Sequence, residues 1–145
     1  MILRVLLAYL MFPLFAVAED INSPIQLSSL AADNAEVIIL SPKHNQVVSS
    51  TFTVEFGAKN ISIVPAGDNQ PNSGHHHLLI DVTELPDLSM PLPATDQIVH
   101  FGKGQTQTVI ELAPGVHTLQ LLLGNYLHVP HTEPVISEKI TIMVE

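Results

Sequence analysis

From Glu36 onward, hydrophobic and polar residues alternate in short runs, a pattern typical of half-buried β-strands. The run 51–57 (TFTVEFG) is the clearest example, because Phe52, Val54 and Phe56 would share one face of a strand. Runs of this kind predict strands over residues 36–40, 51–57, 61–65, 76–83, 106–112, 116–123 and 137–144, and a short extended segment over residues 98–101.

Turn-forming segments separate these runs. The tripeptide 113–115 (APG) has Pro and then Gly where a β-turn favours them, and Gly102 and Gly104 predict a hairpin turn with positive φ. Three prolines in residues 84–96 predict a meandering loop. No segment has an apolar period of 3.6 residues. We therefore predict an all-β fold over residues 36–145, a single antiparallel β-sandwich of immunoglobulin-like type with about seven strands. A barrel is the alternative.

The first 18 residues (MILRVLLAYLMFPLFAVA) have the layout of a secretory signal peptide. Arg4 supplies a positive charge, an apolar run follows, and Ala16-Val17-Ala18 offers small residues for cleavage. The alternative is a retained membrane anchor. Cleavage after Ala18 predicts a periplasmic or secreted protein with no other membrane span. Residues 19–35 show no sustained period and are expected to form an N-terminal arm or tether.

Composition narrows the functional classes. The chain has 145 residues, of which 46% are hydrophobic, enough for the core of one domain. Its formal charge of -9 argues against a nucleic-acid-binding protein. The absence of Cys excludes disulfides, zinc–thiolate sites and thiol catalysis. Eight histidines outnumber the five Lys and Arg residues, so imidazole chemistry is the main candidate.

Three consecutive histidines, His75, His76 and His77, lie where the predicted strand 76–83 begins. Side chains alternate between the two faces of a strand, so His76 would share the core-facing side with Leu78. His75 and His77 would lie together on the opposite face. At the spacing of about 6.5–7 Å between residues i and i+2, two inclined imidazoles can reach one metal ion. The alternative is that they are ordinary rim residues bonded to loop carbonyls.

A second pair, His128 and His131, lies in the loop after the strand 116–123. Pro130 restricts this loop and so lowers the entropy lost when both side chains are presented together. If the two pairs meet at one end of the sandwich, three or four imidazole nitrogens converge on one ion. All-nitrogen coordination suits copper(II) or zinc, which are the expected cofactors.

Three further histidines complete the set in the mature chain. His100 and His117 lie in or beside predicted strands and are second choices, as metal ligands or as residues that orient a ligand. His44 is next to a turn and is expected to be plain surface. The acidic excess of the chain would attract a cation of any kind.

Several longer segments resemble a known family. They are GHHHLLID (74–81), HFGKGQTQT (100–108), LAPGVHTLQLLLGN (112–125), HVPH (128–131) and PVISEKITIMV (134–144), in that order. Together they resemble secreted bacterial domains catalogued as domain of unknown function 4399, over nearly all of the mature chain. The resemblance implies a small exported domain and no particular activity.

These observations lead to three hypotheses. The first is an exported, non-catalytic sandwich that binds a transition metal, chiefly through His75, His77, His128 and His131. The second is a metal-free interaction module that presents loops or an edge strand to an envelope protein or polymer. The third is a metallohydrolase, for which only Asp81 or Glu133 offers a base beside an open metal position. We predict no enzyme activity, no catalytic residue and no nucleic-acid partner.

Overall fold

The computed structural model describes residues 26–145, so the predicted signal peptide and the first part of the predicted arm lie outside the described residues. The strands are β1 (Glu36–Ser41), β2 (Val47–Val48), β3 (Thr51–Lys59), β4 (Ser62–Ile63), β5 (Ser73–Ile80), β6 (Ile98–His100), β7 (Gln107–Glu111), β8 (Gly115–Gly124) and β9 (Ile140–Val144). No helix occurs in this part of the chain, and hence none that has the length and apolarity to cross a membrane.

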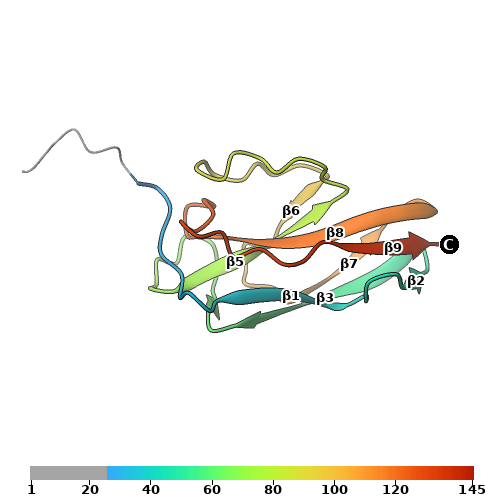
Figure 1. The fold of residues 1–145 in the computed structure, drawn as a ribbon, viewed down its shortest axis with the longest axis horizontal. Helices are drawn as coiled ribbons and strands as arrows, with labels where there is room; N and C mark the ends of the chain where they lie inside the picture. Colours follow the sequence, from blue (N-terminus) through green and yellow to red (C-terminus); the bar gives the residue numbers. More distant parts are fainter. Residues whose placement is uncertain (1–25) are drawn as a thin grey trace, which may run out of the picture.

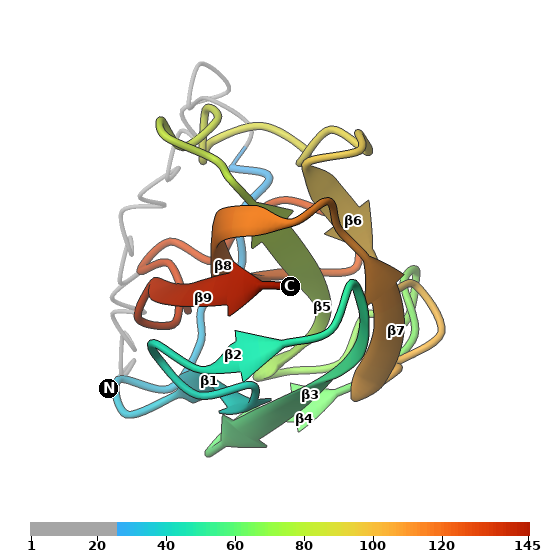
Figure 2. The same ribbon diagram turned by 90° about the vertical axis from the view of Figure 1, so that its right-hand side faces the viewer.

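Two sheets pack face to face, with β1 and β3 below β8 and β9 in Figure 1. The smaller sheet has the order β1-β3-β7 and is antiparallel. The larger has the order β2-β9-β8-β5-β4, with β6 also paired to β5. The prediction of an all-β sandwich is confirmed. The segment that we describe has nine strands instead of about seven, and β2 and β4 make parallel pairs with β9 and β5 (Figure 2). The two residues of β2 are too few to show an alternation in the sequence.

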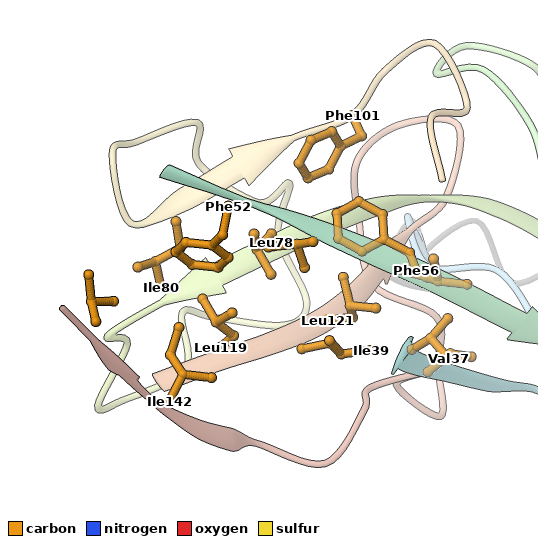
Figure 3. Packing of buried hydrophobic residues seen from close by; sticks show 14 residues of the cluster. Val37, Ile39, Phe52, Phe56, Leu78, Ile80, Phe101, Leu119, Leu121 and Ile142 are labelled. Atoms are coloured by element: carbon orange, nitrogen blue, oxygen red, sulfur yellow. The ribbon is translucent and has the colours of Figure 1, made fainter. Parts of the chain in front are cut away.

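The main core lies between the sheets, where the alternating residues predicted for 51–57 point inward. Val54 is fully buried and Phe56 is 3% exposed. The ring of Phe56 packs on Phe101 with the centroids 5.0 Å apart, and Leu78 and Leu121 approach from the opposite sheet (Figure 3). Burial of each large apolar side chain contributes about 1.5–3 kcal/mol, which opposes the conformational entropy lost when the chain folds.

A second, smaller apolar cluster covers the outer face of the larger sheet. It consists of Leu79, Leu92, Ile98 and Leu122. Leu92 belongs to the proline-rich loop 81–97, which folds over this sheet on the side away from β1 and β3 (Figure 1). As a result every residue of β5 is buried. In the predicted strand 76–83, alternation would place Val82 on the same core-facing side as Leu78. Val82 packs instead on this second cluster, because Asp81 has φ 54° and breaks the alternation.

The described part of the N-terminal arm, residues 26–35, runs beside the loops of the larger sheet. The amide of Thr132 donates to the carbonyl of Ser29 at 3.0 Å, and Asn125 Nδ2 donates to the carbonyl of Leu27 at 2.9 Å. The arm therefore borders the loop in which the second histidine pair was predicted.

Candidate metal centre

Four histidines from three segments converge on the outer face of the larger sheet. His75 and His77 project from β5, and His100 is the register partner of His77 on the neighbouring strand β6. Directly paired residues of an antiparallel sheet share a face, so His100 comes to the same side. His128 reaches this group from the loop after β8. We call these four residues the His cluster.

The imidazole rings of the His cluster contact one another in every combination. The ring centroids of His75 lie 4.9 Å from His77, 5.0 Å from His100 and 4.9 Å from His128. The centroids of His77 and His100 are 5.2 Å apart, those of His77 and His128 6.1 Å, and those of His100 and His128 4.7 Å. One ring nitrogen each of His75, His100 and His128 lies within 4.8 Å of the other two. Nitrogens at this spacing can bind one ion together.

Two glycines leave room for these rings. A Cβ on Gly124 would lie 2.7 Å from Cε1 of His77, and a Cβ on Gly102 would lie 2.4 Å from Cε1 of His100. Gly124 is the register partner of His75 on β8, so any side chain there would enter the His cluster. The prediction of a positive φ holds for Gly104, at 74°, but is wrong for Gly102. The contact with His100 explains why glycine occupies position 102.

A tight loop places His128 in the cluster. His128 has φ 67°, in the left-handed region of backbone conformation that residues other than glycine rarely adopt. Such strain persists only where neighbouring contacts impose it. The Asn125 side chain supplies those contacts, since its Oδ1 accepts hydrogen bonds from the amides of Leu127 at 2.9 Å and Val129 at 3.1 Å. The carbonyl of His128 in turn accepts a bond from the amide of Leu92.

Burial favours the neutral form of three imidazoles, those of His75, His77 and His100. The pKa of His75 is lowered from 6.5 to about 4, mainly because burial removes solvation and to a smaller extent because His128 and His100 lie close by. Burial and then the neighbouring His75 lower the pKa of His77 to about 3, and burial also lowers the pKa of His100. Neutral imidazole is the form that binds metal ions. Both ring nitrogens of His75 and His77, and Nε2 of His100, are buried without a hydrogen-bond partner among the described residues.

The remaining histidines lie apart from the His cluster. His131 is buried and its Nε2 lies 3.0 Å from the carbonyl of Ser73, but it does not belong to the group of ligand atoms that includes His128. His117 lies at the opposite end of β8, with Nδ1 2.7 Å from Asp81 Oδ2. His44 is exposed, as expected for a surface residue.

The middle residue of the histidine triplet, His76, faces the main core, as the strand alternation predicts. Its ring centroid lies 5.1 Å from that of Phe56, and the side chain is fully buried. Burial lowers its pKa to about 4. The two faces of one strand thus present histidines to two different environments.

Three of these four residues, His75, His77 and His128, were predicted as main ligands, and His100 was predicted as a second choice. The supporting roles of Gly124, Gly102 and Asn125 beside the His cluster were not predicted. The signals that the sequence offered were the segment 74–77 (GHHH) and the dipeptide 124–125 (GN). What was missing was the pairing of β6 with β5, which makes His100 a neighbour of His77.

Comparison with known proteins places the chain in a family. The family described as Domain of unknown function (DUF4399) matches residues 54–145. The chain belongs to this family. The match confirms the resemblance found in the sequence, and it includes all four residues of the His cluster. No curated protein and no solved structure matches this chain. The family description names no activity, so the geometry of the His cluster is the main guide to function.

Proposed function

We propose that this protein binds one divalent transition-metal ion through His75, His77, His100 and His128, and that it handles or is stabilised by the metal without catalysing a reaction. The observation that carries the proposal is the mutual contact of four imidazole rings from three separate segments. Copper(II) and zinc are the candidate ions, because both are bound by imidazole nitrogen.

The energetics of the His cluster support this proposal. A buried polar atom without a hydrogen-bond partner costs about 1–3 kcal/mol, and the His cluster contains five such nitrogens on His75, His77 and His100. Collecting them on one face is therefore unfavourable unless something binds them. A metal ion would engage one nitrogen of each ring and offset part of this cost through binding energy.

The surroundings of the cluster support a non-catalytic role. Asp81 and Glu133 were the only candidate bases for a metallohydrolase. Asp81 is already engaged by His117 and by the amide of Thr118, and Glu133 is an exposed loop residue. Neither belongs to the group of ligand atoms around His75. We further propose that the protein acts after export, in the periplasm or outside the cell, on the basis of its N-terminal sequence.

Calorimetric titration of the purified, tag-free protein with Zn(II) and Cu(II) tests the proposal. We expect one ion per chain and a loss of binding in the double variant His100→Ala/His128→Ala. These two side chains are only half-buried, so their removal disturbs the core least. The matched control is His44→Ala, an exposed histidine outside the cluster, which should bind like the wild type. Dissociation constants weaker than about 0.1 mM, or about 5.5 kcal/mol, would refute the proposal, as would binding that survives the double variant.

A metal-free interaction module is the second candidate function, and an exposed apolar row favours it. Val47, Met143 and Val116 are register partners across β2, β9 and β8, with exposures of 53%, 40% and 63%. Crosslinking in intact cells, compared between the wild type and Val116→Lys, tests this function. A specific crosslinked partner that disappears in the variant, whose metal binding is unchanged, would support it. Crosslinks unaffected by the substitution would argue against it.

A further inference from the structure

We infer that the His cluster is a closed, tetrahedral four-nitrogen site that selects zinc(II), with His77 as the fourth ligand. This inference rests on the proposed function and goes beyond it, because it assigns the coordination geometry and the identity of the ion. It follows from the ring-to-ring distances, the chemistry of the donor set and the rigidity of the strands that carry it.

The ring distances distinguish two coordination geometries. With a zinc–nitrogen bond of about 2.0–2.1 Å, the centre of a bound imidazole lies about 3.2 Å from the metal. Four tetrahedral ligands then have all six centroid separations near about 5.2 Å. Four square-planar ligands have four separations of about 4.5 Å and two of about 6.4 Å, and the two long ones join opposite pairs of rings.

The observed separations follow the tetrahedral pattern. Five of the six lie between 4.7 and 5.2 Å. Only His77 and His128 are farther apart, at 6.1 Å. In a square plane the opposite pair, His75 and His100, would be equally far apart, but its centroids are 5.0 Å apart. His77 does not belong to the group of ligand nitrogens formed by His75, His100 and His128, so its ring must turn toward this group to complete the tetrahedron.

The donor set narrows the choice of ion. No carboxylate shares the group formed by His75, His100 and His128, so the site does not suit calcium or magnesium, which prefer oxygen ligands. Copper(I) favours soft sulfur ligands, whereas the four residues of the His cluster offer only imidazole nitrogen. Copper(II) favours tetragonal coordination, whereas zinc(II) has no electronic preference and takes four ligands tetrahedrally.

The protein resists rearrangement toward a flat site. His75 and His77 are on a strand whose two edges are paired, with β8 on one side and with β6 on the other. The ring of His100 lies against Gly102, where backbone atoms limit its movement. Since selectivity between transition ions depends on geometry as well as on intrinsic affinity, a site held near a tetrahedron disfavours copper(II). Four protein ligands also leave no position for a reactive water, which is typical of a structural zinc site.

Cobalt(II) is the probe that tests the geometry, because it substitutes for zinc and its visible absorption reports coordination number. We expect the tag-free protein to bind one Co(II) with the intense visible bands of a tetrahedral complex, and Zn(II) to displace it. His77→Ala should abolish these bands and weaken Zn(II) binding by more than roughly 100-fold, the upper end of what loss of a mere orienting partner costs. The matched control is His76→Leu, which removes the adjacent buried histidine from the opposite face and should keep the bands.

The outcomes separate this inference from the proposed function. Tight binding of Zn(II) with only the weak bands of six-coordinate Co(II) would overturn the tetrahedral assignment and leave the proposed function intact. Unchanged Zn(II) affinity in a folded His77→Ala protein would overturn the four-ligand assignment and the part of the proposed function that makes His77 a ligand, and would leave a metal site formed by His75, His100 and His128. Failure of the wild type to bind either ion would overturn both. Intense bands that are lost in His77→Ala and retained in His76→Leu would support the inference.

Discussion

Replacement of His76 by leucine should stabilise the metal-free protein. His76 is fully buried against Phe56, and neither of its ring nitrogens has a hydrogen-bond partner among the described residues. An unsatisfied buried polar atom costs about 1–3 kcal/mol, and leucine has a similar volume without a polar atom. Loss of the ring contact with Phe56 offsets about 0.5–1.5 kcal/mol of the gain. The net increase in the free energy of unfolding should be about 1–2 kcal/mol near neutral pH.

The gain should grow as the pH falls. Burial lowers the pKa of His76 to about 4 in the folded state, compared with 6.5 for the exposed side chain. Between these values the unfolded chain binds a proton that the folded chain does not, so the stability of the wild type falls with decreasing pH. At about 1.36 kcal/mol for each pH unit below 6.5, the loss from this residue reaches about 2 kcal/mol at about pH 5. Leucine at this position cannot titrate, and the difference between the two proteins should therefore reach about 3–4 kcal/mol.

Urea unfolding in the presence of a chelator, at about pH 7.5 and about pH 5, measures both quantities. Far-UV circular dichroism follows the unfolding, and equal m-values for the two proteins establish that only stability has changed. A variant less stable than the wild type at both pH values would refute the reasoning. So would a stability difference that is the same at both pH values, because it would mean that His76 does not titrate between the folded and unfolded states as its burial requires.

Three further predictions concern residues around the site. Gly124→Ala should destabilise the fold by about 1–3 kcal/mol and abolish metal binding, because the added Cβ would lie 2.7 Å from Cε1 of His77. If calorimetric titration shows the same metal affinity for this variant as for the wild type, the close packing of the His77 ring on Gly124 is contradicted. Asn125→Ala should weaken zinc binding by roughly 10- to 100-fold through loss of the loop bonds, and an unchanged affinity in titration would show that the loop keeps its shape without them. The hydrogen bond to Asp81 raises the pKa of His117, so this contact stabilises the fold fully at low pH and loses its effect as the pH rises through that raised value. His117→Gln should thus lower the urea midpoint at about pH 5.5 and leave it nearly unchanged at about pH 8.5, and the opposite order would disprove the ion pair.

Features that depend on local periodicity could be predicted from the sequence. The alternation in residues 51–57 predicted which side chains of β3 enter the core, and Phe52, Val54 and Phe56 do so. The same alternation assigned His75 and His77 to one face of β5 and His76 to the other. A strand's geometry fixes these relations whatever surrounds it, because successive side chains always point to opposite faces.

Which segments meet at the outer face of β5 depends instead on the tertiary structure. His100 joins the His cluster because β6 pairs with β5 in the register that sets it opposite His77. His131 does not join the cluster because its ring lies beside Gly74 and Ser73, away from the ligand atoms of His75, His100 and His128, although its spacing from His128 favoured it in the sequence. Strand pairing and loop conformation depend on contacts between residues far apart in the chain, and one residue's shift in register would move His100 to the other face. The sequence therefore supplied the histidines, and the packing of the strands and loops selected the four that meet.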